Sequence, residues 1–234
     1  MNDRKLVRVQ QKGQVTIPTE IRKKLGLKRG DLVAVMETPE GVFITPQQVV
    51  AAKALDSIGD IVKEKGLSVD EPIAQGRDIR TDLYKKPMVS PNPQRRIFPD
   101  SSVLYAAAFS ATGPARRLIL KGVEGSIALA ISDLVLEETK RNLTKNAPET
   151  LPYFTILADL FSPVITNPTK AEVLKAAQIV HLKDAPIVAA ATKGEADYLA
   201  THDVKHLLTH AKAIESAYGI SVLTAADILH ILTN

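Results

Sequence analysis

The chain has 234 residues with a formal net charge of +4, is 45% hydrophobic and contains no cysteine. The lack of cysteine excludes disulfides, thiolate catalysis and cysteine zinc sites, and no apolar run approaches the roughly 18 residues that a transmembrane helix needs. The N-terminus shows no apolar stretch of a secretory signal, so a cytoplasmic location is expected.

The positive charge is concentrated in the N-terminal fifth of the chain. Residues 1–47 hold nine Lys and Arg against five Asp and Glu, whereas residues 97–234 hold twelve against fourteen. Such a distribution favours a polyanionic partner for the N-terminal segment. The alternative is an ordinary solvated surface.

The first 47 residues have the pattern of a very small β-rich unit. Alternating apolar and polar residues predict strands, and Gly13 suits the turn between the first two. The elements predicted in chain order are strands at 5–10 and 15–17, a helix at 19–25 that Thr19 caps and Gly26 ends, and strands at 32–36 and 42–45. So short a unit buries little surface alone, so we expect it to dimerise.

The next segment differs in pattern. Residues 48–66 carry apolar side chains at helical spacing, and Gly66 suits the end of that helix. A second helix is predicted over 70–84. Residues 87–95 contain three prolines and little apolar content, which indicates a linker and the main domain boundary.

From residue 96 onward, predicted strands alternate with predicted helices. In chain order we expect a strand at 97–98, helices at 104–109 and 114–123, a strand at 127–131, helices at 132–143, 149–160, 170–179 and 185–193, strands at 198–200 and 220–223, and a closing helix from 225. This alternation predicts an α/β domain with a parallel sheet.

Acidic residues follow several of these predicted strands. Asp100 and Asp203 come just after strands, Glu137 and Glu138 lie in the helix after the second strand, and Asp184 begins a helix. Because ligands of α/β sheets gather at the carboxyl ends of strands, these carboxylates are expected to converge and to need a hard cation such as Mg²⁺ or Mn²⁺. The alternative is that each acid complements a helix dipole.

Four segments of this half resemble, in order and spacing, the motifs of the PIN-domain nucleases. They are Asp100–Ala107, Ile131–Thr139, Lys183–Ala191 and Ala196–Asp203, and the resemblance runs from about residue 97 to 224. It implies a ribonuclease that uses Mg²⁺ or Mn²⁺, with RNA as its substrate.

The resemblance also implies the roles of individual residues. The metal-holding, catalytic acids are Asp100, Glu138 (in preference to Glu137), Asp184 and Asp203. Supporting roles are implied for Thr201, which would orient the last acid or a water, for Ser102, and for Asp197 as a fifth acid. Two departures from the family's pattern are Pro99, in place of an apolar strand residue, and Ser102, where many relatives have asparagine.

The histidines suggest a second kind of site. His202, His206 and His210 are four residues apart and would share one face of a helix, as zinc ligands can. His202 is expected in a loop, however, which breaks that face and favours a solvated surface. For His206, the PIN-like context suggests a role in RNA binding.

The sequence from Lys12 to Leu27 resembles the AbrB/MazE-type swapped-hairpin domain, with the match covering residues 5–45. The family implies an intertwined dimer, or a higher even oligomer, that binds duplex DNA. Contacts to phosphates or base edges are expected from Arg8, Lys12, Gln14, Arg22, Lys23 and Lys24. Gln14 departs from the arginine that several relatives carry.

Residues 54–83 resemble the tail that follows this hairpin in antitoxins of VapBC-type pairs, where the tail wraps the PIN partner; a plain helical linker is the alternative. The resemblance implies an antitoxin–toxin fusion whose Arg77 and Arg80 inhibit its own nuclease. The expected units are a swapped-hairpin DNA-binding domain at 1–47, a helical tail and linker at 48–95, and a PIN-like nuclease at 96–234. Alternatives are a transcriptional autoregulator with a silent PIN domain, and a nuclease that acts on DNA.

Overall fold

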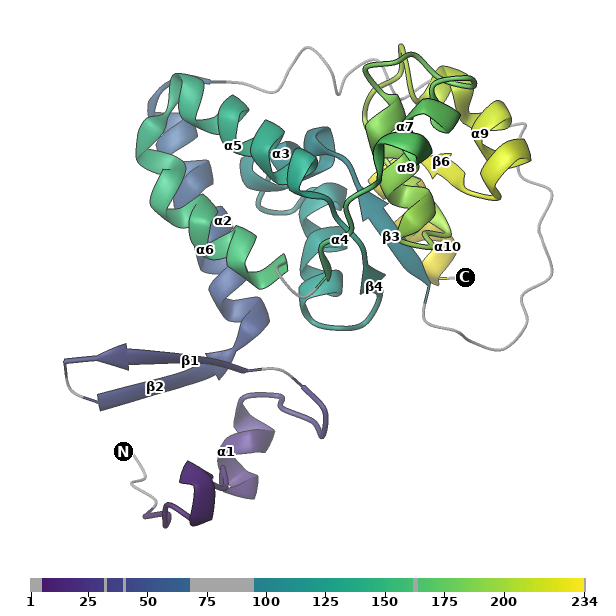
Figure 1. Cartoon of the computed structure of the whole chain (residues 1–234). Helices are drawn as coiled ribbons and strands as arrows, with labels where there is room; N and C mark the ends of the chain where they lie inside the picture. The colour runs from purple at the N-terminus through teal and green to yellow at the C-terminus, as the bar shows by residue number, and fades with distance from the viewer. Residues whose placement is uncertain (1–5, 32, 40, 68–94, 162–163, 234) are drawn as a thin grey trace.

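The structure is a computed structural model that describes residues 6–31, 33–39, 41–67, 95–161 and 164–233. Figure 1 shows a small N-terminal unit, drawn in purple and blue, connected through helix α2 to a larger α/β body in teal, green and yellow. The predicted helix at 70–84, the linker up to residue 94, and with them Arg77 and Arg80, lie outside the described residues.

The N-terminal unit contains one antiparallel hairpin and two short helical segments. Its elements are η1 (Gln11–Gly13), α1 (Thr19–Lys24), β1 (Val33–Thr38) and β2 (Gly41–Pro46). The turn, the helix and the two later strands are therefore confirmed. Gly26 follows α1 with a φ of +69°, as a helix-ending glycine does. The cap was wrongly predicted: Pro18 precedes the first turn, and the Thr19 hydroxyl accepts from the Arg22 guanidinium instead.

The predicted strands at 5–10 and 15–17 are reduced to one antiparallel bridge between Val9 and Val15. Both side chains are exposed, Val9 to 71%. Strands persist when neighbouring strands pair with them and cover their apolar side chains. Within one copy of the described unit, these arms have no such cover, so the sequence pattern is not realised as a ladder.

Helix α2 (Gln47–Glu64) is the predicted helix of residues 48–66, and it packs against α3, α4 and α6 of the body. Its fully buried apolar stripe comprises Ala51, Ala54, Leu55, Ile58 and Val62. Gly59 lies against α3 so closely that a Cβ there would stand 2.6 Å from the Ala108 carbonyl oxygen. Residues 47–64 therefore share the hydrophobic core of the body.

The body is a four-stranded parallel sheet with helices around it, which confirms the predicted α/β class. The strands are β3 (Arg96–Pro99), β4 (Ala128–Leu129), β5 (Tyr198–Ala200) and β6 (Ser221–Leu223), in the order β4-β3-β5-β6. The helices are α3 (Ser101–Phe109), α4 (Pro114–Val123), α5 (Asp133–Asn146), α6 (Leu151–Phe161), α7 (Lys170–Ala176), α8 (Ala185–Lys193), α9 (Ala211–Tyr218) and α10 (Ala225–Thr233).

Helix α9 was not predicted. Ile214 is the fully buried residue of α9, whereas α8 and α10 each bury several. The predicted elements elsewhere in the body recur in place, with ends that shift by a few residues. The short 3-10 segments η3 (Pro148–Thr150) and η5 (Leu208–His210) precede α6 and α9.

Pro99 is accommodated at the end of the central strand β3. The Asp100 amide donates to the Ala200 carbonyl on β5, so the position of Pro99 faces the other neighbour, β4. The β4 ladder ends two residues earlier, at the pair Ile97–Leu129. Proline has no backbone N–H to donate, but at this position the pairing with β4 has already ended. The proline therefore breaks no hydrogen bond of the sheet.

Candidate metal centre

The strand order places a topological switch point between β3 and β5. The chain leaves β3 for β4 on one side and later returns to β5 on the other side of β3. In open parallel sheets, the crevice beyond the carboxyl ends of two such strands is where ligands bind. Asp100 directly follows β3, and Thr201 and Asp203 follow β5, so two of the predicted acids lie at the carboxyl ends of these strands.

Asp100 is the most buried of these acids, with 5% of its surface exposed. Its Oδ1 accepts from the Ser102 hydroxyl at 2.6 Å and from the Val103 amide at 3.1 Å, so it also caps α3. Its Oδ2 accepts from the Thr201 hydroxyl. Burial raises the pKa of Asp100 to about 6 against the lowering effect of these hydrogen bonds, and the negative charge of Asp203 adds to the rise.

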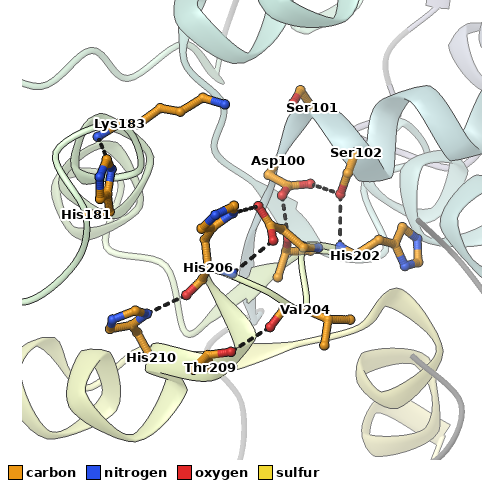
Figure 2. Close-up of polar contacts among 12 residues, drawn as sticks. Asp100, Ser101, Ser102, His181, Lys183, His202, Val204, His206, Thr209 and His210 are labelled. Carbon is orange, nitrogen blue, oxygen red and sulfur yellow. Dashed lines mark hydrogen bonds and ion pairs between the residues drawn. The ribbon is translucent and has the colours of Figure 1, made fainter. Parts of the chain in front are cut away.

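Two hydroxyls connect the loops after β3 and β5. Thr201 donates to Asp100 and accepts from the Asp203 amide at 2.9 Å, while Ser102 donates to Asp100 and accepts from the His202 amide at 2.9 Å (Figure 2). Each hydroxyl acts as donor and acceptor at once. Ser102 and Thr201 therefore connect the Asp100 carboxylate to the backbone of the loop after β5.

Asp184, Asp203 and His206 form a group whose possible ligand atoms all lie within 4.8 Å of one another. Asp184 precedes α8, and its carboxylate makes no capping bond to that helix. An acid that serves to stabilise a helix start usually accepts a hydrogen bond from a backbone amide of the first turn, and Asp184 makes no such bond to α8. In Figure 2, the imidazole of His206 lies on the side of the site where Asp100 lies, and His206 Nδ1 is 3.0 Å from Asp203 Oδ2.

Glu138 comes from the middle of α5, and its Oε2 accepts from the Ser101 hydroxyl at 2.9 Å. Ser101 directly follows Asp100, so this bond brings Glu138 to the same end of the sheet, while Glu137 is exposed. Neither Asp100 nor Glu138 joins a group of three possible metal ligands within 4.8 Å among the described residues. Of the four predicted acids, Asp184 and Asp203 are the two that the structure gathers into such a group.

Asp197 lies at the opposite end of the sheet from this crevice, so its predicted supporting role at the site is wrong. It precedes β5, and its carboxylate accepts from the Arg95 guanidinium at 3.1 Å and from the Arg96 amide at 2.8 Å. These contacts join the amino ends of β3 and β5. Asp197 is therefore a structural residue.

The three spaced histidines do not share a face. His202 lies in the loop after β5, where burial lowers the pKa of its imidazole and its Nε2 has no hydrogen-bond partner among the described residues. His210 Nδ1 contacts the His206 carbonyl oxygen at 2.6 Å. His202 lies in a loop, as predicted, and of these three histidines only His206 joins a group of acids among the described residues.

The contribution of Ser101 and the position of His206 beside two acids were not predicted from the sequence. Ser101 follows the first acid directly, and a hydroxyl there was an available signal. The position of His206 depends on the turn after Asp203, in which the His206 amide donates to Asp203 Oδ1 at 3.0 Å. An acid followed three residues later by an exposed histidine is the pattern that could have indicated it.

The predicted DNA-contacting residues lie on the N-terminal unit, and all are exposed: Arg8, Lys12, Gln14, Arg22, Lys23 and Lys24. Lys12 and Gly13 both have positive φ, at +63° and +76°, in the turn between the two arms. The Gln10 amide donates to the Gln14 carbonyl at 2.7 Å and closes that turn. A basic, exposed turn and the basic end of α1 are thus presented on the same small unit.

Comparison with known families identifies the N-terminal part. The family described as "Antidote-toxin recognition MazE, bacterial antitoxin" matches residues 6–50, which include η1, α1, the hairpin and the beginning of α2. This part of the chain is therefore similar to a MazE antitoxin domain, as its sequence predicted. Comparisons with curated proteins and with solved structures give no match. Among the described residues, no helix combines the length and the apolar character needed to span a membrane.

Proposed function

We propose that this protein is a fused antitoxin and toxin: a DNA-binding, dimerising N-terminal module followed by a metal-dependent ribonuclease of the PIN type. The observation that carries the proposal is the arrangement at the switch point. There Asp184 and Asp203 converge with His206, and the buried Asp100 lies next to them. The three acids lie within sequence motifs that resemble those of PIN nucleases, and His206 follows the last motif by three residues.

The donor set suits a divalent cation. Carboxylate oxygens are ligands for Mg²⁺ and Mn²⁺, and the charges of Asp100 and Asp203 repel one another without a cation. Asp184 and Asp203 would hold the ion, with Asp100 and Glu138 completing the negative environment. The ion would supply an activated water and stabilise negative charge on a phosphodiester.

The chain's own residues perform the positioning. Thr201 fixes Asp100 relative to Asp203, and Ser102 fixes Asp100 relative to the loop after β5. Ser101 directs Glu138 toward the same end of the sheet. These hydroxyl contacts hold the acids in place before substrate binds, which lowers the reorganisation that the reaction requires.

The N-terminal module is proposed to dimerise because one copy covers few of its apolar side chains. Exposed residues of the described unit include Leu6, Val9, Val15, Val35, Val42 and Phe43. A second copy would cover these side chains in a swapped-hairpin dimer, as the similarity to MazE suggests. The basic turn and α1 then provide contacts to DNA phosphates and bases.

Helix α2 is proposed to correspond to the antitoxin tail that covers the toxin. It packs on α3, α4 and α6 through its apolar stripe. Arg116 of α4, which is 4% exposed, donates to the Ala52 carbonyl at 2.8 Å and to the Asp56 carboxylate at 2.5 Å. The tail would continue past residue 67 to Arg77 and Arg80, whose guanidinium groups could pair with the acids of the centre and inhibit it.

A second candidate is a transcriptional autoregulator whose α/β body is catalytically silent. It is favoured by one observation: both oxygens of Asp100 are engaged by Ser102, Val103 and Thr201, and Asp100 stands outside the group of possible ligands. A third candidate, a nuclease that acts on DNA, is suggested by the DNA-binding module alone.

Cleavage of matched RNA and DNA oligonucleotides by the purified full-length chain distinguishes these candidates. The assay uses Mn²⁺, Mg²⁺ or EDTA, in the native chain and in an Arg77→Ala/Arg80→Ala background that removes the proposed inhibition. We expect RNA cleavage that EDTA abolishes and that Asp100→Asn lowers by at least about two orders of magnitude. Asp197→Asn, at the far end of the sheet, is the matched control and should retain cleavage.

Each alternative gives a different pattern in this assay. Preferential cleavage of DNA would support the third candidate. The absence of cleavage in both backgrounds, with DNA binding intact, would support the silent autoregulator. Cleavage that persists in EDTA and in the Asp100 variant would overturn the metal-dependent mechanism.

A further inference from the structure

The turn after β5 holds His206 in a defined position. The His206 amide donates to Asp203 Oδ1, the Leu208 amide donates to the Asp203 carbonyl at 3.0 Å, and the Thr209 hydroxyl donates to the Val204 carbonyl at 2.7 Å. Leu207, next to His206, is 3% exposed and anchors the turn in the core. His206 is therefore fixed through its backbone, although its side chain is half exposed.

The separation of His206 and Asp203 is that of two ligands of one ion. His206 Nδ1 lies 3.0 Å from Asp203 Oδ2. Adjacent ligands at about 2.1 Å from a divalent ion, at right angles to each other, stand about 3 Å apart. Asp184 completes the group: one possible ligand atom from each of Asp184, Asp203 and His206 lies within 4.8 Å of the other two. One ion could thus contact an imidazole and two carboxylates, with the remaining positions open to water.

We propose that His206 is a direct metal ligand, so that this centre prefers a transition-metal ion to Mg²⁺. This inference rests on the proposed metal centre and adds a nitrogen ligand to its acids. Mg²⁺ favours carboxylate and water oxygens and retains much of its hydration, whereas imidazole favours transition metals. A mixed set of two carboxylates and one imidazole therefore discriminates against Mg²⁺.

The tautomer of His206 follows from this role. To coordinate through Nδ1, the imidazole must carry its proton on Nε2, and no proton remains between Nδ1 and Asp203 Oδ2. Asp203 changes from a hydrogen-bond partner of His206 to its neighbour in the coordination sphere.

Pulsed electron paramagnetic resonance of Mn²⁺ bound to the full-length chain tests the proposal directly, because it detects a ligating ¹⁴N. The expected result is an imidazole nitrogen coupling in the native protein that His206→Gln removes. His230→Gln, on the exposed side of α10, is the matched histidine control and should leave the coupling unchanged. By titration, His206→Gln should weaken Mn²⁺ binding by at least about tenfold, and Mg²⁺ binding by a smaller factor.

The possible results separate this inference from the proposed function. Mn²⁺ that binds and depends on Asp184 and Asp203, but shows no imidazole coupling, would overturn the role of His206 and leave the metal centre standing. Equal weakening of Mn²⁺ and Mg²⁺ by His206→Gln would overturn the selectivity. Mn²⁺ binding that Asp203→Asn and Asp184→Asn leave unchanged would overturn the metal centre itself, and the inference with it.

Discussion

Arg116 on α4 donates to the Asp56 carboxylate on α2, and the guanidinium side chain is buried while the carboxylate is more than half exposed. This contact ties the helix after the DNA-binding module to the α/β body. A second constraint is the close approach of Gly59 to the Ala108 carbonyl. Together they make α2 a part of the body's core.

The docking of α2 should therefore be sensitive to small changes at its contacts. Gly59→Ala places a methyl group 2.6 Å from a backbone oxygen and should lower the free energy of unfolding by about 1–3 kcal/mol. Asp56→Ala removes the carboxylate partner of Arg116 and leaves the Ala52 carbonyl as its acceptor. It should lower the free energy of unfolding by about 1–2 kcal/mol, because water can partly replace an exposed carboxylate. Urea denaturation measures both, with Asp60→Ala on the exposed side of α2 as control. Unchanged stability in the Gly59 variant would contradict this packing.

Asp100 should make the stability of the metal-free chain depend on pH. Its pKa is raised from 3.8 to about 6 by burial, so the folded state holds this proton more tightly than the unfolded state. The stabilising contribution of protonated Asp100 to the free energy of unfolding is present below about pH 4 and is lost as the pH rises through 6. A difference of about two pKa units is worth roughly 3 kcal/mol.

Asp100→Asn removes this titration. Relative to the native chain, the variant should gain free energy of unfolding between pH 4.5 and 7.5 in EDTA, by up to about 3 kcal/mol. The measured quantity is how the difference in free energy of unfolding between the variant and the native chain changes with pH. The altered hydrogen bonds to Ser102 and Thr201 shift this difference by a constant amount, so they do not affect its change with pH. A difference that stays constant with pH would show that Asp100 is not a buried, titrating acid.

The N-terminal module should bind duplex DNA with a strong dependence on salt, because phosphate contacts release counterions. Arg22→Ala/Lys23→Ala in the full-length chain removes two exposed cations of α1 and should flatten the slope of log K against log salt by about two units. Fluorescence anisotropy measures the slope, and Lys121→Ala on α4 of the body is the control. An affinity that does not depend on salt would argue against this assignment.

Self-inhibition is tested in the full-length chain. A fragment that begins after α2 would lack the residues that α2 contributes to the hydrophobic core. Arg77→Ala/Arg80→Ala should raise the rate of RNA cleavage, since a tethered tail acts at an effective concentration of about a millimolar. The matched control is Lys85→Ala/Lys86→Ala, which removes two cations further along the chain. Equal rates for the native chain and both variants would mean that the segment is a connector.

The sequence predicted the body closely where apolar periodicity is strong and caps are explicit. Helix α4 begins at Pro114 as expected, and α5 follows Ser132, whose hydroxyl caps it. Helix α9 was missed because Ile214 is its only fully buried residue, so few apolar side chains mark the helix in the sequence. The first two predicted strands failed for a different reason: their apolar side chains need a partner that one chain does not supply.

The site was partly accessible from sequence. The rule that ligands gather at the carboxyl ends of strands predicted the acids after β3 and β5. The prediction for Asp197 did not follow this rule, because the predicted strand at 198–200 already separated Asp197 from Asp203. The approach of His206 to Asp184 could not be predicted, because it depends on how the turn after β5 meets the start of α8. Such a contact is a tertiary relationship that no local pattern encodes.

We propose that the carboxyl ends of β3 and β5 hold a divalent ion. Anomalous diffraction from a crystal of the full-length chain soaked with Mn²⁺ can locate such an ion. We expect a Mn²⁺ peak in contact with Asp184 and Asp203, with His206 in the same coordination sphere, and loss of the peak in Asp203→Asn. A fully soaked crystal with no anomalous peak near these residues would show that no divalent ion binds there.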